Sequence, residues 1–105
     1  MCTVIVAHQC IPGVPLLVAS NRDEFKSRPF APPGVLDSTL ELYGGRDEVA
    51  GGSWAVFTGS GAFVAVTNQR SPHPPDPHRL PRGQLVLDVA RSLAIHGVSQ
   101  TVDWV

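Results

Sequence analysis

The sequence predicts an α+β fold, because its strand signals come before its one clear helical signal. The first strand signal is a pair of β-branched, apolar segments on either side of a Pro-Gly turn. The second is a pair of apolar segments around Gly-Ser-Gly. The helical signal repeats apolar residues at the spacing of an α-helix. A strand-rich half should therefore be followed by a helical half.

Residues 2–7 and 16–20 are expected to form the first hairpin. Pro12 and Gly13 supply the fixed and the permissive φ that a chain reversal needs. If the chain reverses there, the numbers of paired residues sum to about 25. Cys2 then lies opposite Asp23 and Thr3 opposite Arg22. The polar tetrad Asn21–Glu24 would thus be delivered beside the start of the chain.

Three later segments are expected to be loops. Residues 28–34 and 71–81 are rich in proline, which removes a backbone donor and breaks regular structure. Residues 43–52 carry four glycines. Within that last segment, Arg46 and Asp47 are expected to pair with each other on the surface.

Residues 53–58 and 62–67 are expected to form the second hairpin, because the turn between them is short and rich in glycine. Its aromatic residues, Trp54, Phe57 and Phe63, are expected in the core. The helix is expected over residues 83–96. Its apolar side should carry Leu85, Val86, Val89 and Leu93. Gly97 should end this helix, and Ser99 should cap another.

Composition and charge exclude several classes of protein. The chain has 105 residues, a formal net charge of -1 and no basic stripe, so no nucleic-acid partner is expected. No apolar stretch is long enough for a membrane span, and no basic leader precedes an apolar segment. With only two cysteines, a cytoplasmic protein is expected. His73 and His78 lack further ligands at suitable spacing, so neither a metal site nor a cofactor is expected.

Cys2 is a candidate nucleophile, because removal of Met1 would make it the first residue of the mature chain. A terminal cysteine carries its own base. An α-amino group has a pKa of about 7.7–8.0, so a useful fraction of it is neutral near pH 7. The predicted register puts Arg22 near the thiol and Asp23 near the amine. The alternative is that Cys2 is a small buried hydrophobe and that the tetrad is a solvated turn.

Other candidate site residues lie at strand ends and in glycine-rich segments. Asn68 follows an apolar strand and could donate an N–H to an oxyanion, or it is simply a turn residue. The expected substrate-binding residues are Asn21, Gly51, Gly52 and Trp54. The two glycines would let the backbone approach a ligand closely, although ordinary loop flexibility would also explain them.

Several short motifs occur in a specific order along the chain. They are Met1-Cys2, ASNRDEF with Arg28-Pro29 close behind, GGRD at Gly44–Asp47, AGGSW at Ala50–Trp54, VTNQR at Val66–Arg70, and Arg82-Gly83. This series resembles the NRDE protein family, also called the transport and Golgi organisation protein 2 family. Members are usually well over twice as long. The resemblance therefore implies that residues 1–105 are the N-terminal portion of a single NRDE-family domain, and an incomplete one.

The resemblance also implies a fold and a chemistry. The family is similar to N-terminal-nucleophile (Ntn) cysteine hydrolases, in which two antiparallel sheets lie between helical layers, an αββα sandwich. Carried onto this chain, Cys2 is the nucleophile and its freed amine the base. Arg22 and Asp23 would support the thiol and the amine, and Asn68 would be an oxyanion donor. The reaction would be hydrolysis of a non-peptide C–N (amide) bond.

A second reading of the resemblance is a non-enzymatic carrier. Members of the family are linked to secretion and Golgi organisation and to haem handling, so the chain could carry haem or a lipid. The expected partner is then an apolar ligand, whereas the enzyme would bind a small-molecule amide. The sequence leaves the oligomeric state open.

Overall fold

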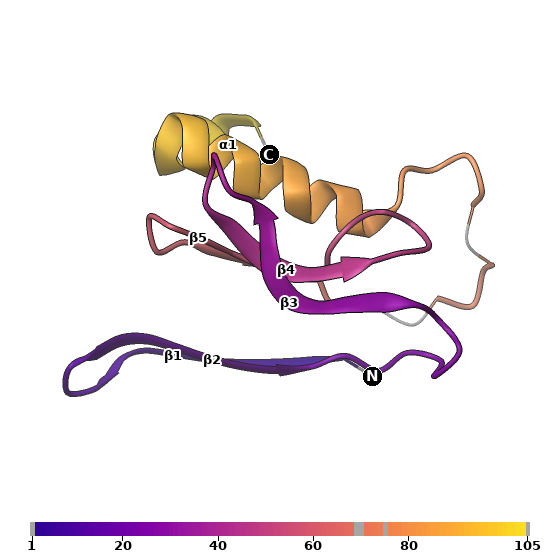
Figure 1. The fold of residues 1–105 in the computed structure, drawn as a ribbon, viewed down its shortest axis with the longest axis horizontal. Coiled ribbons are helices and arrows are strands. Elements are labelled where there is room, and N and C mark those ends of the chain that lie inside the picture. Colours follow the sequence, from indigo (N-terminus) through magenta and orange to yellow (C-terminus); the bar gives the residue numbers. More distant parts are fainter. Residues whose placement is uncertain (1, 69–70, 75, 105) are drawn as a thin grey trace.

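In the computed structural model, residues 2–68, 71–74 and 76–104 are described, with side chains up to Val98. This part of the chain contains six strands in two antiparallel sheets and one helix (Figure 1). The first sheet pairs β1 (Thr3–Ile11) with β2 (Val14–Asn21). The second contains, in chain order, β3 (Phe30–Asp37), β4 (Leu42–Asp47), β5 (Ala55–Thr58) and β6 (Phe63–Ala65). Helix α1 spans Arg82–Trp104. The α+β prediction is confirmed.

The first hairpin reverses at the expected turn, but its register differs from the prediction by one residue. Ile11 lies opposite Val14, as a reversal at Pro12 and Gly13 requires. Further along the hairpin, however, Thr3 lies opposite Asn21 rather than opposite Arg22. Extending the pairing by one step brings Cys2 level with Arg22, not with Asp23.

A β-bulge explains the shift. His8 lies opposite Leu16 and Ile11 opposite Val14, so Gln9 and Cys10 together face the single residue Pro15. Proline has no N–H to give to the ladder and is tolerated in strands at edges or bulges. Gln9 accommodates the extra residue with a positive φ of 53°. The turn therefore has the predicted register, and the bulge moves the rest of the hairpin by one residue.

Strands β3 and β4 occupy much of two segments that were expected to be loops, so those two predictions are wrong. β3 lies at the edge of the second sheet, where proline is tolerated. Its pairing with β4 skips from Ala31 to Gly34, past the two prolines. In β4 the glycines serve close packing. A Cβ on Gly44 would collide with the carbonyl of Ala55, and one on Gly45 with the indole of Trp54.

The second hairpin and the helix form the core. Phe57 lies opposite Phe63 across the expected Gly-Ser-Gly turn. Helix α1 packs on β4, β5 and β6 and covers one face of the second sheet (Figure 1). The buried hydrophobic cluster consists of Leu42, Val56, Val86, Leu87 and Ala90. Leu85 was expected on the apolar side of the helix but is 51% exposed. The buried side of the helix is instead formed by Val86, Leu87 and Ala90.

The opposite face of the second sheet carries an apolar row. Val35, Tyr43, Phe57 and Phe63 lie opposite one another on the four successive strands. The rings of Phe57 and Phe63 are 4.6 Å apart between centroids. Phe57 is 42% exposed, so the prediction of a buried aromatic there is wrong. Strand alternation is the reason, since Val56 and Thr58 point to the helix and Phe57 points away from it.

The two sheets do not stack on each other. Within the described part of the chain, β1 and β2 contact each other but no strand of the second sheet and not the helix. Figure 1 shows the hairpin, in indigo, lying apart from the rest of the molecule. The described fold is thus α+β, without the sheet-on-sheet contact of an αββα sandwich.

The loop before the helix and the break at Gly97 are as predicted. Residues 71–74 and 76–81 contain no helix or strand. Gly97 breaks α1 with a φ of 78° and a ψ of −178°, and the backbone is helical again up to Trp104. The proposed capping side chain of Ser99 lies outside the described side chains. Gly97 takes the left-handed φ that commonly ends a helix.

Candidate functional site

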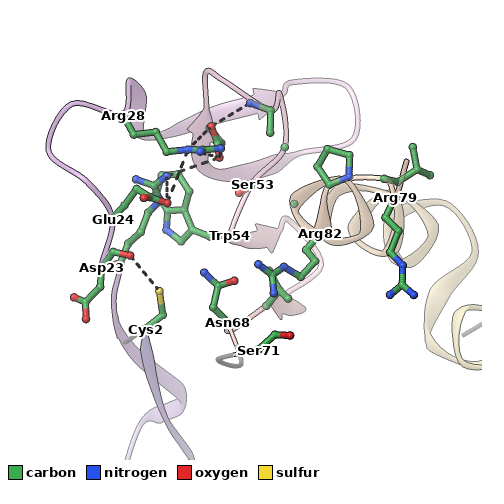
Figure 2. A pocket seen from close by; sticks show the side chains of 18 of the residues that line it. Cys2, Asp23, Glu24, Arg28, Ser53, Trp54, Asn68, Ser71, Arg79 and Arg82 are labelled. Carbon is green, nitrogen blue, oxygen red and sulfur yellow. Dashed lines mark hydrogen bonds and ion pairs between the residues drawn. The ribbon is translucent and has the colours of Figure 1, made fainter. Parts of the chain in front are cut away.

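A cavity of about 890 Å³ lies between the end of the first hairpin, the start of β5 and the start of α1 (Figure 2). Six of the eight predicted site residues line it: Cys2, Arg22, Asp23, Gly52, Trp54 and Asn68. Asn21 and Gly51 were expected beside the substrate but are not among its lining residues. The tetrad, the glycine-rich segment and the end of the second hairpin are therefore brought to one place.

Asn21 fixes the position of Asp23. Its side-chain oxygen accepts a hydrogen bond from the Thr3 N–H at 2.8 Å, and its side-chain NH₂ donates to the Asp23 carboxylate at 2.9 Å. The Cys2 thiol lies 4.0 Å from the carbonyl oxygen of Asp23, a weak contact drawn as a dashed line in Figure 2. Asn21 thus links the start of β1 to Asp23 and does not itself line the cavity.

Asp23 carries a lowered pKa. The largest cause is a hydrogen bond from the terminal amine of the chain, followed by the attraction between the two charges. Slight burial opposes the shift, and the hydrogen bond from Asn21 adds to it. The lowered pKa keeps the carboxylate of Asp23 ionised. The amine concerned is that of Met1, so the predicted interaction of Asp23 with the amine of Cys2 stays a prediction.

Arg22 is held by aromatic rings and carboxylates. Its guanidinium carbon lies 4.5 Å from the centroid of the Trp54 ring and 5.6 Å from that of Phe30. Its Nη2 lies 3.8 Å from Asp47 and 4.0 Å from Glu24. The role predicted for it was support of the Cys2 thiol. Its interactions with described residues instead join the end of the hairpin to the second sheet.

A second arginine makes the strongest ion pair at the site. Arg28 donates from Nε and Nη2 to the Asp47 carboxylate, with the shortest distance 2.8 Å. Asp47 was expected to pair with Arg46, and that prediction is wrong. The cause is the pairing of β3 with β4, in which Phe30 lies opposite Asp47 and carries the preceding residues of the chain to that carboxylate. Only the Arg-Pro that follows the tetrad could have drawn attention to Arg28.

Arg28 and Asp47 each stabilise the charged form of the other. Burial tends to raise the pKa of Asp47. Hydrogen bonds from Arg28 and from the backbone N–H groups of Ala50 and Val49 outweigh burial, so the pKa is lowered. The pKa of Arg28 is raised, first by its hydrogen bond to Asp47. Asp47 therefore orders the turn that follows β4 and holds the chain that follows the tetrad.

The glycine-rich segment packs directly on the start of the helix. The Ser53 N–H donates to the Gly83 carbonyl at 3.1 Å. A Cβ on Gly52 would collide with the backbone of Gly83, and a Cβ on Gly83 would lie 2.9 Å from the carbonyl oxygen of Ser53. Close approach to the backbone of Gly83, rather than loop flexibility, explains Gly52. The contact brings Arg82, the first residue of α1, to the wall of the cavity.

Asn68 and Arg82 face each other within the cavity. Figure 2 shows the amide of Asn68 and the guanidinium of Arg82 turned toward each other, with the Cys2 thiol beyond Asn68. Arg82 was part of the last sequence motif but was assigned no role there. The combination of a thiol, an amide donor and a guanidinium in one cavity suits attack on a carbonyl group with stabilisation of the oxyanion.

The described residues contain neither a cluster of metal ligands nor a helix that could cross a membrane. Among the described residues, no group of three or more His, Cys, Asp or Glu side chains could hold a metal ion. Over the same residues, no helix has the length and apolar character needed to cross a membrane. Both cysteines, Cys2 and Cys10, are free thiols.

Comparison with known proteins identifies the family. The family model described as "Transport and Golgi organisation 2" matches residues 1–101. The chain therefore belongs to the transport and Golgi organisation 2 family, the family that its motifs resemble. Neither the search of curated proteins nor the search of solved structures found a significant match.

Proposed function

We propose that the chain is an amidohydrolase of the N-terminal cysteine type, with Cys2 as its nucleophile after removal of Met1. The observation that carries the proposal is the convergence of Cys2, Asp23 and Asn68 on one cavity. The lowered pKa of Asp23 supports it further, because an ionised carboxylate at the end of the first hairpin would orient the amine that removal of Met1 frees on Cys2.

The proposed reaction has two steps. The terminal amine takes the proton of the Cys2 thiol, and the sulfur attacks the amide carbon to form a C–S bond. Asn68 donates a hydrogen bond to the resulting oxyanion. The C–N bond then breaks, and the leaving amine takes the proton from the terminal amine. Water hydrolyses the thioester, which releases the carboxylic acid and restores the thiol.

We propose that the two sheets belong to an Ntn-type αββα sandwich, which the apolar row on the open face of the second sheet supports. A cytoplasmic location is part of the proposal, since free thiols at Cys2 and Cys10 suit a reducing compartment.

The test is a screen of small N-acyl amides, read as released amine by mass spectrometry. The wild-type chain should lack Met1 and should turn over at least one member of the panel through an acyl adduct on Cys2. Cys2→Ala should abolish turnover, whereas Cys10→Ala, a matched loss of a thiol on the distal part of the hairpin, should leave it unchanged. Turnover that survived Cys2→Ala would eliminate the proposal.

A second candidate is a carrier of an apolar ligand such as haem or a lipid. The family's description as a transport and Golgi organisation protein favours it, and so does the exposed row of Val35, Tyr43 and Phe57. A carrier should bind haem or a fatty acid saturably, and Cys2→Ala should retain that binding. Titrations without saturation for either ligand would remove this candidate.

A further inference from the structure

The charged side chains of the cavity are paired, with one exception. The carboxylate of Asp47 is held by two arginines, and Asp76 lies 3.7 Å from Arg79. Asp23 is occupied by the terminal amine. Arg82 also lines the cavity, yet it has no ion-pair or hydrogen-bond partner among the described residues. The cavity therefore contains one guanidinium whose charge no described carboxylate balances.

The position of Arg82 is set by the fold. It is the first residue of α1, and the packing of Gly52 against Gly83 brings this end of the helix to the cavity. Its guanidinium is turned toward Asn68, with Cys2 beyond (Figure 2). The first turn of α1 contains no acidic residue, so no side chain there offsets the positive charge of Arg82. A group bound between Cys2 and Arg82 would meet a thiol at one end and a cation at the other.

Guanidinium groups bind carboxylates well, because two parallel N–H donors match the two carboxylate oxygens. We propose that Arg82 anchors a carboxylate on the substrate, so that the substrate class is a small amide carrying a carboxylate, such as an N-acyl amino acid. This inference rests on the proposed amidohydrolase function and names the substrate class for the same site. Arg82 is a specificity-determining residue in this account, and Cys2 remains the nucleophile.

Two alkylating reagents of nearly equal shape test the proposal. Iodoacetate carries a carboxylate where iodoacetamide carries a neutral amide, and both form a thioether with a cysteine and release iodide. The measured quantity is the ratio of the iodoacetate rate to the iodoacetamide rate at Cys2, obtained by peptide mapping. Cys10, an exposed thiol at the bulge of the first hairpin, supplies the reference ratio within the same molecule.

The expected result is a ratio at Cys2 above that at Cys10. Arg82→Gln should lower the ratio at Cys2 by about threefold or more at low salt, since one unit charge is removed from the cavity. Arg82→Lys should retain most of it. Arg91→Gln removes the same charge from the same helix outside the cavity and should change nothing. The differences should shrink in about 0.5 M salt, where charges are screened over a few ångströms.

The outcomes separate this proposal from the amidohydrolase. An unchanged ratio in Arg82→Gln, or an equal fall in Arg91→Gln, would overturn the carboxylate anchor. The iodoacetamide rate alone reports the reactivity of the Cys2 thiol. If Cys2 reacts fast with iodoacetamide but Arg82→Gln leaves the ratio unchanged, the proposed amidohydrolase stands and the carboxylate anchor is refuted. If Cys2 reacts with iodoacetamide no faster than Cys10, but the ratio falls in Arg82→Gln, the cavity binds an anion and Cys2 is not an activated nucleophile.

Discussion

Substitution of Asp47 should loosen the attachment of the tetrad to the second sheet. The Asp47 carboxylate accepts three hydrogen bonds from Arg28 and lies 3.8 Å from Arg22. It also accepts from the N–H groups of Val49 and Ala50, at 3.0 and 3.2 Å. Asp47→Asn keeps an oxygen for the two backbone donors and removes the charge. Asp47→Ala removes both sets of interactions.

The magnitude follows from these contacts. A hydrogen bond to a charged group contributes about 1.5–3 kcal/mol. The side chains of Arg28 and Asp47 are 31% and 18% exposed, so solvent screening reduces that value. Asp47→Asn should therefore lower the free energy of unfolding by about 1–2 kcal/mol. Asp47→Ala should lower it by roughly 2–4 kcal/mol, because the two turn hydrogen bonds are lost as well. For Asp47→Asn, this corresponds to a fall in Tm of roughly 5–15 °C.

The effect should depend on pH. The pKa of Asp47 is lowered in the folded state, so its contribution is present above the unfolded pKa of about 3.9. The contribution is lost as the pH falls through the lower, folded pKa. The difference in Tm between the wild type and Asp47→Asn should be constant at neutral pH and should shrink below about pH 4.

Thermal unfolding followed by circular dichroism is the assay. Asp88→Asn serves as the matched control, because Asp88 pairs with Arg91 on the exposed side of α1 and should contribute under about 0.5 kcal/mol. If Asp47→Asn changed Tm no more than the control, or if its effect persisted unchanged at low pH, the reasoning about the ion pair would be refuted.

Two further substitutions test the walls of the cavity. Gly52→Ala should lower the free energy of unfolding, measured with a chemical denaturant, by about 1–3 kcal/mol, because the new Cβ meets the backbone of Gly83. Gly34→Ala is the control, since a Cβ there would lie 3.9 Å from its nearest neighbouring atom, and it should lower the free energy by under about 1 kcal/mol. A double-mutant cycle of Arg22→Met and Trp54→Leu should give a coupling of about 1 kcal/mol from the cation–π contact at 4.5 Å, and a coupling near zero would show that the contact contributes nothing.

The first hairpin shows what local sequence can predict. Its strands and its turn follow from propensity and from Pro12-Gly13, and the pairing at the turn is as expected. The register beyond the turn was wrong because Pro15 creates a bulge. The signal was present in the sequence, since a proline inside a strand cannot donate to the ladder. A single such residue moves every later pair by one position.

The second sheet shows where local sequence misleads. The glycines of β4 and the prolines of β3 are typical of loops, yet here they serve close packing and an edge position. Both reasons depend on neighbours that are distant in sequence, namely Ala55 for Gly44 and Trp54 for Gly45. Propensity within a short window carries no information about those neighbours.

The positions of the candidate site residues were predicted better than the ion pairs and packing around them. The tetrad lies beside the start of the chain because hairpin geometry is local. The pairing of Arg28 with Asp47 and the arrival of Arg82 at the cavity depend on how the second sheet and the helix assemble. The sequence motifs that contain these residues were visible, but their partners could not be assigned without the pairing of β3 with β4.

The most direct test of the account is the rate at which iodoacetamide alkylates Cys2 near pH 7, divided by the rate at Cys10 in the same molecule. This ratio is compared between the wild type and Asp23→Asn. An activated terminal nucleophile predicts a chain without Met1, a Cys2 rate about tenfold or more above that of Cys10, and a clear loss of that advantage in Asp23→Asn. Retention of Met1, with equal rates at the two thiols in both proteins, would contradict the central claim that Cys2 is a nucleophile supported by Asp23.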